Sequence, residues 1–230
     1  MNAYIIVEGS QTEMRVYPAW LGILAPRLSR VDSPAALSNN NYYLFTGGGI
    51  PSIYKHISNA VEDINNINAG GKKIDYLLVC LDTEKEDREY ILNKIQATLE
   101  ADGRVINDFQ LLVFEHKICM ESWFLGNRRV FKSNPQDPDY MRYVRFYNVG
   151  TENPELMGNG DEERFTTKAQ FHHQYLRLML RERNMHYAKS NPQTVCSEAY
   201  LNELIARYQE TDDLKTFGSW YEFVMHRLQP

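Results

Sequence analysis

The sequence predicts an α/β protein in which a Rossmann-like, mostly parallel sheet of four strands is flanked by helices and followed by a helical C-terminal extension. Three observations lead to this prediction. Short apolar runs alternate with helical periodicity in the first half of the chain, and this β-α order is typical of parallel sheets. The run Leu77–Leu81 is apolar at every position, as in a central strand buried on both faces. With 43% hydrophobic and 12% aromatic residues, the 230-residue chain can bury a sizeable core, which excludes a disordered protein.

The expected strands are the apolar runs of the first half. Each run is too short for a stable helix and is rich in β-branched or aromatic residues. The first ends at Glu8-Gly9, and the second is followed by Gly47-Gly48-Gly49. The four runs are Tyr4–Val7, Tyr42–Thr46, Ile74–Leu81 and Phe109–Phe114.

Helices are expected where apolar residues recur every three or four positions. In 51–68, a stripe of isoleucines and one valine follows Pro51, which suits a first helical turn, and precedes Gly70-Gly71, which ends the helix. The expected helices are Glu13–Leu28, Pro51–Asn68 and Glu84–Ala101 in the first half, and Thr166–Arg183, Ser197–Tyr208 and Leu214–Leu228 in the second.

The chain is expected to contain three parts. Residues 1–126 hold all of the strand-like runs. Residues 127–164 are rich in Asn, Pro and Gly and lack a clear period, which predicts long loops with little regular structure. Residues 165–230 carry the last three helical stripes, and they are expected to pack on the first part as an extension.

Two features predict a cytoplasmic protein with no membrane partner. The longest apolar stretches, Ala19–Pro26 and Leu77–Leu81, fall far short of the roughly 20 residues that cross a bilayer, and the N-terminal residues lack the basic flank of a signal peptide. Cys80, Cys119 and Cys196 are odd in number and widely spaced. This spacing is typical of a reducing compartment and argues against a disulfide framework or a thiolate zinc site.

Acidic side chains follow three of the four expected strands. Glu8 follows the first, Asp82 and Glu84 follow the third, and Glu121 comes soon after the fourth. In an open parallel sheet these carboxyl ends form the ligand-binding edge. Two carboxylates about 4 Å apart repel by roughly 4 kcal/mol at an effective dielectric of 20, so such a cluster retains protons or binds a divalent cation. Carboxylate oxygens favour Mg²⁺ or Mn²⁺ over zinc.

Simpler interpretations of several residues stay open. Asp82 could cap the helix that follows it. Gly47-Gly48-Gly49 could hold a phosphate on backbone amides, although a tight strand-to-helix turn is favoured because the lysine of a P-loop is missing. His116 and Lys117 fit an ordinary loop, and Lys117 is also a candidate to neutralise a leaving group or a phosphate. His172-His173 fits a partly exposed helix face, because no second pair of ligands has zinc spacing.

Three short motifs resemble those of Toprim domains. The segment Val7–Glu13 (VEGSQTE) resembles the opening Toprim motif, and Asp82-Thr83-Glu84 takes the place of the Asp-x-Asp motif. Met120–Leu125 (MESWFL) resembles a Glu-x-Trp-x-Leu element found after the next strand. The order and spacing agree over roughly residues 4–126. The chain is similar in particular to stand-alone RloB-like Toprim proteins and to the nuclease half of OLD-family proteins.

The resemblance implies a metal-dependent fold that cleaves or rejoins phosphodiesters. By this likeness Glu8 would be the general acid/base or a ligand of a second metal, while Asp82 and Glu84 would bind Mg²⁺ (or Mn²⁺). Glu121 would complete or support the acidic cluster, and Glu13 would be a further member. Glu84 stands where many relatives have Asp, which moves the carboxylate outward by about one methylene and puts metal binding there in question.

The function expected from this resemblance is a small Mg²⁺-dependent nuclease acting on RNA or DNA. Relatives are often encoded beside an ABC- or AAA-type ATPase in phage-defence loci such as the PARIS system, so an anti-phage effector controlled by a partner ATPase is expected. The chain itself has no GxxxxGK[ST] loop. The alternatives are a catalytically inactive Toprim module of an ATPase complex and a small-molecule phosphohydrolase. The choice between RNA and DNA, and whether the chain forms a homodimer, stays open.

The net charge of -5 lies entirely in the first half, because residues 1–126 carry 11 basic and 16 acidic groups whereas 127–230 carry 14 of each. A local basic segment therefore remains available for nucleic acid. Its basic residues are Arg128, Arg129, Lys132, Arg142 and Arg145. Aromatic residues such as Tyr140 and Tyr143 are interleaved, which suits base stacking, although a solvated loop with structural tyrosines is an equal alternative. Arg177–Lys189 is a second candidate face.

Overall fold

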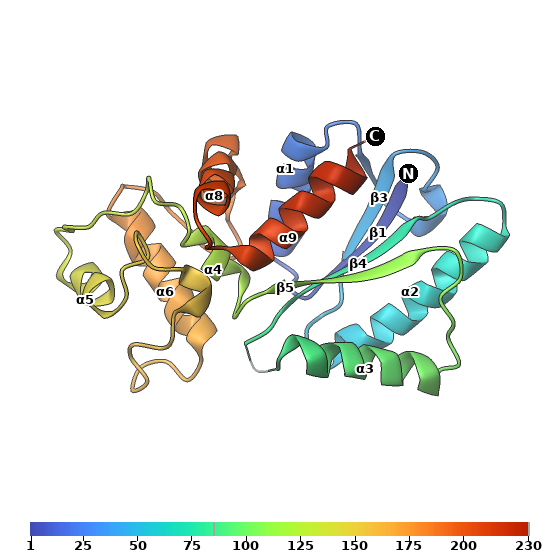
Figure 1. The fold of residues 1–230 in the computed structure, drawn as a ribbon, viewed down its shortest axis with the longest axis horizontal. Coiled ribbons are helices and arrows are strands. Elements are labelled where there is room, and N and C mark those ends of the chain that lie inside the picture. The colour runs from blue at the N-terminus through green and yellow to red at the C-terminus, as the bar shows by residue number, and fades with distance from the viewer. Residues whose placement is uncertain (85, 230) are drawn as a thin grey trace. The chain divides into compact units, whose positions relative to one another are not determined.

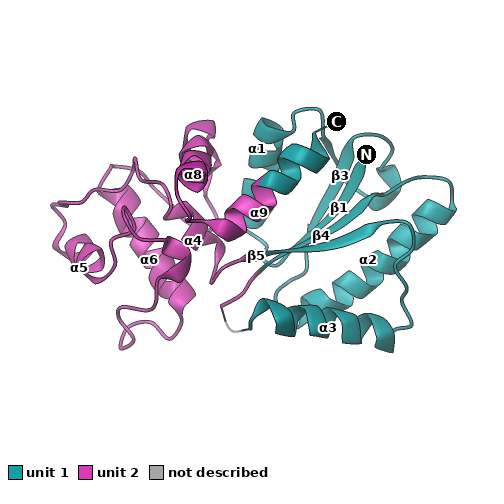
Figure 2. Cartoon of the chain, in the orientation of Figure 1, with its two compact units in different colours: residues 1–81, 86–115, 222–230 teal, residues 82–85, 116–221 magenta. Residues whose placement is uncertain are grey.

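A computed structural model describes residues 1–84 and 86–229 of the chain (Figure 1). The chain divides into two compact units (Figure 2). Unit 1 comprises Met1–Leu81, Glu86–Glu115 and Glu222–Pro230, and unit 2 comprises Asp82–Lys85 and His116–Tyr221. The chain therefore leaves unit 1 at the carboxyl ends of two strands, β4 (Tyr76–Asp82) and β5 (Gln110–His116).

In the described residues, unit 1 is built on a five-stranded parallel sheet with the order β2-β3-β1-β4-β5. The pairs β1–β3, β1–β4 and β2–β3 are parallel. Backbone hydrogen bonds join β4 and β5 at Asp75–Gln110 and at Thr83–His116, so the two strands advance in the same direction. The remaining strands are β1 (Asn2–Val7), β2 (Ser29–Val31) and β3 (Asn41–Thr46).

The predicted α/β class with a parallel sheet is confirmed, with one strand more than expected. The additional strand, β2, has three residues and lies at the sheet edge. Its side chains are exposed or half-buried, so it lacks the apolar run by which the four other strands were predicted.

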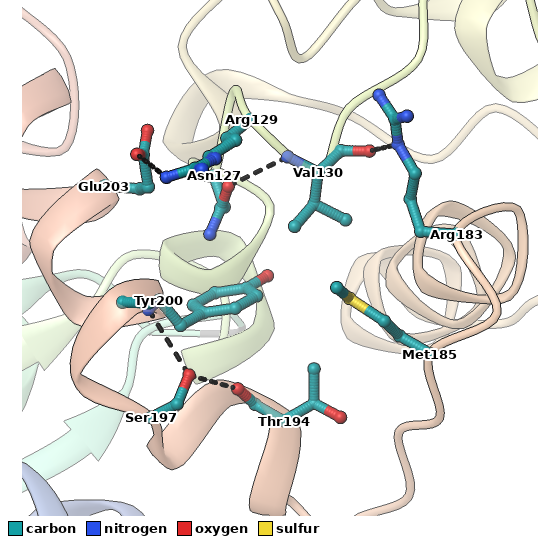
Figure 3. Close-up of a pocket in the computed structure, with 10 residues that line it drawn as sticks. Asn127, Arg129, Val130, Arg183, Met185, Thr194, Ser197, Tyr200 and Glu203 are labelled. Atoms are coloured by element: carbon teal, nitrogen blue, oxygen red, sulfur yellow. Dashed lines mark hydrogen bonds and ion pairs between the residues drawn. The ribbon is translucent and has the colours of Figure 1, made fainter.

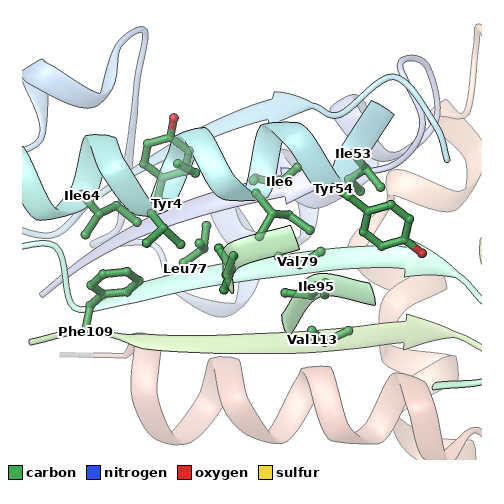
Figure 4. Close-up of a cluster of buried hydrophobic side chains, with 14 of the residues drawn as sticks. Tyr4, Ile6, Ile53, Tyr54, Ile64, Leu77, Val79, Ile95, Phe109 and Val113 are labelled. Carbon is green, nitrogen blue, oxygen red and sulfur yellow. The ribbon is translucent and has the colours of Figure 1, made fainter. Parts of the chain in front are cut away.

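One face of the sheet packs against the helices α2 (Ser52–Ala69) and α3 (Arg88–Ala101), as Figure 4 shows. Tyr4 and Ile6 of β1 alternate with residues that face the other way, because successive side chains of a strand point to opposite faces. Full burial of an aliphatic side chain such as that of Ile6 stabilises the fold by about 1.5–3 kcal/mol. The α2 residues in this core are Ile53, Tyr54, Ile57, Ala60, Val61 and Ile64.

The second face is covered within unit 1 by α1 (Glu13–Leu24) and by the C-terminal π-helical turn η3 (Val224–Leu228). Val16 and Trp20 of α1 are fully buried. The helix ends four residues earlier than expected, because Pro26 disfavours helical geometry in the residue before it. Phe223 packs edge-on against Tyr76 with the ring centroids 5.1 Å apart.

Unit 2 holds the remaining helices, and one of them lies in the segment 127–164, which is otherwise mostly loop, as expected, apart from one short 3-10 turn. The helix α5 (Pro138–Phe146) lies there, with Asp137 accepting hydrogen bonds from the first turn and Pro138 at the first position. Tyr143 of α5 stacks on Phe171 with the ring centroids 4.7 Å apart. The other helices are α4 (Met120–Phe124), α6 (Lys168–Arg181), α7 (Gln193–Cys196), α8 (Glu198–Glu210) and α9 (Lys215–Phe223), with short 3-10 turns η2 (Pro154–Leu156) in unit 2 and η1 (Pro34–Ala36) in unit 1.

A buried arginine joins several segments of unit 2. Arg207 of α8 is fully buried, and its guanidinium pairs with Asp213 at 2.7 Å. The same group donates to the backbone carbonyls of Gly126, Val149 and Glu152. The planar guanidinium thus connects the end of α4, the loop after α5 and the α8–α9 turn.

Across the described residues, every helix is too short or too polar to cross a membrane. The three cysteines all lie in the described part of the chain, and none forms a disulfide there.

Candidate acidic site at the carboxyl ends of the strands

The backbone of Glu8 is fixed at the end of β1 by the neighbouring strands. Val7 lies opposite Thr46 of β3 and opposite Cys80 of β4. The Glu8 amide donates to the Cys80 carbonyl at 3.0 Å, and the Thr46 hydroxyl donates to the Glu8 carbonyl at 3.2 Å. Glu8, which is half-buried, therefore belongs to the carboxyl edge of the sheet, as its place after the first strand predicted.

Gly9 and Glu13 explain the spacing of the first motif. The Gly9 amide donates to Oε1 of Glu13 at 3.0 Å, and Glu13 is only 8% exposed. A Cβ atom at position 9 would overlap the Glu13 carboxylate, so any larger residue there would displace that side chain. The turn after β1 thus places a buried carboxylate in unit 1 at the first residue of α1, five positions after Glu8.

The three glycines after β3 form a tight turn. The amides of Gly47, Gly48 and Gly49 donate to the Val7 carbonyl, the Thr46 hydroxyl and the Glu8 carbonyl, respectively. Gly48 and Gly49 have φ values of 70° and 85°, which L side chains rarely adopt. Because these amides already donate to acceptors within unit 1, the three glycines form a tight turn and not a phosphate-binding loop.

In unit 2, Asp82 is paired with His116, the last residue of β5. Nδ1 of His116 lies 2.9 Å from Oδ1 of Asp82, and the imidazole is fully buried while 30% of the Asp82 side chain is exposed. His116 is therefore a strand residue with a polar partner and not the loop residue that its sequence context suggested. The helix after β4 is capped by Asp87, which accepts from the Tyr90 amide, so Asp82 does not serve as that cap.

The electrostatic surroundings of Asp82 oppose its negative charge. Burial of the carboxylate, followed by the negative charges of Glu121 and Glu84, raises its pKa from 3.8 to about 8. The Lys189 ammonium and a hydrogen bond from the Met120 amide act in the opposite direction but do not cancel these effects. A cation bound beside Asp82 would offset this repulsion.

Glu84 is half-buried, and one oxygen of its carboxylate accepts a hydrogen bond within unit 2. Oε1 accepts the amide proton of Ala169 at 2.7 Å, in the first turn of α6. A carboxylate at a helix N-terminus also interacts favourably with the helix dipole. Glu84 therefore links the end of β4 to α6, in addition to raising the pKa of Asp82.

Glu121 of α4 is buried and held by residues that follow α6 in the chain. Its side chain is 3% exposed, and Oε1 accepts a hydrogen bond from the Tyr187 hydroxyl at 3.0 Å. The Lys189 ammonium lies 3.7 Å from the same oxygen. The sequence predicted Glu121 but neither Tyr187 nor the pairing with Lys189, since they come from a loop 66 residues further on.

The tryptophan of the third motif positions His116. The Trp123 indole N–H donates to the Thr216 hydroxyl at 2.7 Å, and the same hydroxyl donates to the buried carboxylate of Glu155. The indole packs edge-on against the His116 ring with the centroids 4.6 Å apart. The ring that pairs with Asp82 is therefore also held by an aromatic contact.

His172 is a structural residue of unit 2. It is fully buried, whereas the sequence predicted a partly exposed face for both histidines; only His173 is half-buried. Nε2 of His172 lies 2.9 Å from the Met157 carbonyl, which can only accept, so Nε2 carries the proton and Nδ1 accepts from the Ser122 hydroxyl. Burial lowers the pKa of His172 from 6.5 to about 4, so the ring is neutral at physiological pH.

The basic residues expected to contact nucleic acid differ in their surroundings. Arg142 and Arg145 are exposed on α5, and Lys117 is exposed after β5. Tyr140 and Tyr143 are buried in unit 2, so the structural interpretation of these tyrosines holds over base stacking. Three of the cations form ion pairs within unit 2: Arg128 with Glu210, Arg129 with Glu203, and Lys132 with Glu182.

Further carboxylates lie near enough to Asp82 to act on its charge. Glu121 and Glu84 both repel the Asp82 carboxylate, and carboxylate oxygens as a class favour Mg²⁺ or Mn²⁺. His116 adds one imidazole, which the sequence could not assign because its partner is distant in the chain. Comparison with family models, with curated proteins and with solved structures finds no match for this chain.

Proposed function

We propose that the protein is a metal-dependent nuclease of the Toprim type, which hydrolyses phosphodiester bonds of RNA or DNA with Mg²⁺ or Mn²⁺ as cofactor. The observation that carries the proposal is the acidic environment of Asp82 at the carboxyl end of a central parallel strand. Its pKa is raised to about 8 by burial and by the two nearby glutamates. This position in a parallel sheet is where ligands bind in open α/β folds.

In this proposal each acidic residue has a defined role. Asp82 is the principal metal ligand, and Glu84 and Glu121 complete or support the acidic cluster. Glu8, at the end of the neighbouring strand β1, is the general acid/base or a further ligand. A bound divalent cation would stabilise the charge that develops on the attacking and leaving oxygens of the phosphodiester. Lys117 and the basic residues 128–145 remain candidates for contacts with the substrate.

The residues present fit such a cation on chemical grounds. In the metal-free protein a raised pKa keeps a large part of Asp82 protonated near neutral pH. A divalent cation would replace this proton, so metal affinity should rise with pH up to about 8. The proposed enzyme acts in the cytoplasm, in keeping with three cysteines that form no disulfide.

The test combines metal binding with cleavage. Calorimetry measures Mg²⁺ and Mn²⁺ binding, and gel assays measure cleavage of tRNA, single-stranded DNA and duplex DNA. We expect Glu8→Gln and Asp82→Asn to reduce cleavage at least 100-fold while the circular dichroism spectrum is unchanged. The matched control is Glu89→Gln on the exposed side of α3, which should cleave at the wild-type rate. Full cleavage by well-folded Asp82→Asn protein would exclude the proposal.

One observation favours the alternative, a catalytically inactive module that binds a partner ATPase. Glu84 stands where many Toprim relatives have Asp, and its carboxylate is used to bind the Ala169 amide. If Glu84 is only structural, Glu84→Gln should lower thermal stability without changing cleavage or metal affinity. Absence of cleavage in any metal, together with retention of a co-expressed ATPase from the same locus, would favour the inactive module. In either case, control by such an ATPase in phage defence is part of the proposal.

A further inference from the structure

Unit 2 contains a cavity that the acidic site does not use. It lies between the loop that follows α4, the segment that follows α6, and the helices α7 and α8 (Figure 3). Its volume is about 580 Å³, which lies in the range of small-molecule binding pockets.

The walls of the cavity are apolar and held in place. Val130, Met185 and the ring of Tyr200 line it. The Tyr200 hydroxyl donates to the Phe124 carbonyl at 2.7 Å, which fixes the ring, and Tyr200 is only 4% exposed. Because the aromatic ring is anchored before any ligand arrives, little entropy is lost on binding a flat apolar group.

One hydrogen-bond donor points into this apolar space. Asn127 is 2% exposed, and its Oδ1 accepts from the Val130 amide at 3.0 Å. Since the Val130 amide can only donate, the oxygen must face it and the NH₂ group must face the cavity, toward Tyr200 (Figure 3). Among the described residues this NH₂ group has no hydrogen-bond partner. A ligand with an acceptor at this point would therefore find an available donor.

The rim of the cavity carries a net positive charge. Arg183 is exposed, and its Nε and Nη2 donate to the Val130 and Phe131 carbonyls at 2.9 and 3.1 Å, which holds the guanidinium at the rim. Arg129 lies 3.5 Å from Glu203 in an ion pair whose arginine is 78% exposed. A pair of this kind is weak in water, so Arg129 can exchange Glu203 for an anionic ligand.

We propose that this cavity binds one unstacked nucleotide of the substrate strand. The base would lie between the apolar walls and Tyr200, an acceptor on the base would meet the Asn127 NH₂ group, and the adjoining phosphate would contact Arg183 and Arg129. Base–aromatic contacts and guanidinium–phosphate pairs are the usual elements of single-strand binding. A buried donor and two cations at the rim favour this occupant over an apolar side chain of a partner protein. The inference rests on the proposed function, because it names the way in which that enzyme would hold its substrate.

The experiment fills the cavity without removing a contact. Ala199 of α8 lines it and is exposed, so Ala199→Trp should occupy the space of the base. The matched control is Asn202→Trp, which adds the same ring at an exposed position of α8 outside the lining. A third variant, Asn127→Asp, keeps the acceptor for the Val130 amide and removes the NH₂ donor. Fluorescence anisotropy with fluorescein-labelled 12-mers of single-stranded RNA and DNA, in EDTA, measures the dissociation constant of each variant.

We expect Ala199→Trp to weaken binding at least 10-fold and Asn202→Trp less than twofold, both at the wild-type melting temperature, and Asn127→Asp to weaken binding at least 5-fold. If the wild type binds the 12-mers but does not cleave, the proposed nuclease activity is contradicted, whereas the proposed nucleotide pocket is not. Cleavage by the wild type with equal affinities in all variants would defeat the pocket and leave the nuclease standing, and it would point to a protein side chain as occupant. Failure of the wild type to bind either 12-mer would overturn the pocket as well.

Discussion

Replacement of Arg207 by methionine tests how unit 2 is held together. Methionine has a similar length and suits an apolar interior, but it cannot pair with Asp213 or donate to any carbonyl. Arg207 is fully buried and makes all five of its hydrogen bonds within unit 2. Because these bonds join three separate segments, we expect Arg207→Met to destabilise the protein strongly.

The magnitude follows from the groups that lose their partner. Breaking a buried ion pair by removing one member costs about 3–5 kcal/mol. The carbonyls of Gly126, Val149 and Glu152 lose a donor as well, at about 1–3 kcal/mol for each one that stays buried. Asp213 is 20% exposed and can turn toward water, so the low end of both ranges applies. We expect a loss of about 4–6 kcal/mol, against a total stability of roughly 5–15 kcal/mol for a typical domain.

Urea denaturation followed by tryptophan fluorescence and circular dichroism measures this loss. The matched control is Arg128→Met, which removes a partly exposed arginine paired with Glu210 and should cost less than about 1 kcal/mol. A loss below about 1 kcal/mol in Arg207→Met would refute the reasoning, because it would show that the three carbonyls and Asp213 find other partners at little cost.

Three further predictions concern single residues. The folded-state pKa of Asp82, about 8, exceeds its ordinary value of 3.8, so the metal-free protein should lose stability as pH rises from about 4 to 8, by at most ~1.4 kcal/mol per pH unit. Thermal scans should show a flatter pH profile for Asp82→Asn than for the wild type, and added Mg²⁺ should stabilise only the wild type at pH 8. The pKa of His172 is instead lowered to about 4, so the stability that this neutral, buried ring contributes should be lost as pH falls from about 6.5 to 4. Equal loss of stability in acid by the wild type and by His172→Gln would contradict this prediction. Gly9→Ala should cost about 1–3 kcal/mol in urea denaturation because its methyl group would overlap Glu13, whereas Gly22→Ala, in open space on α1, should stabilise by about 0.5–1 kcal/mol.

The parallel sheet could be predicted because its signals are local. A strand buried on both faces must be apolar at every position, and Leu77–Leu81 meets this condition within five residues. The helix α2 carries its apolar stripe along its whole length, so its core face was also predicted. The short helix α5 was missed because its buried face, Tyr140 and Tyr143, spans little more than one turn in a segment rich in helix-breaking residues.

The candidate site likewise contains residues that the sequence predicted and partners that it did not predict. The positions of Glu8 and Asp82 followed from the sequence, because Glu8 directly follows β1, Asp82 is the last residue of β4, and the carboxyl ends of parallel strands lie at one edge. The hydrogen-bond partners of the acidic side chains could not be predicted from the sequence. His116 reaches Asp82 across 34 residues, Tyr187 reaches Glu121 across 66, and Ala169 reaches Glu84 across 85.

The sequence by itself therefore determined the fold class and the acidic residues at the ends of the strands. Both depend on patterns within a few neighbouring residues, where side-chain periodicity records burial directly. Only the tertiary structure decided which groups surround each acid, how far the pKa of Asp82 is raised, and that Asn127 points into a cavity with its NH₂ group. These properties depend on distances between residues that are remote in the chain, and local periodicity carries no information about such distances.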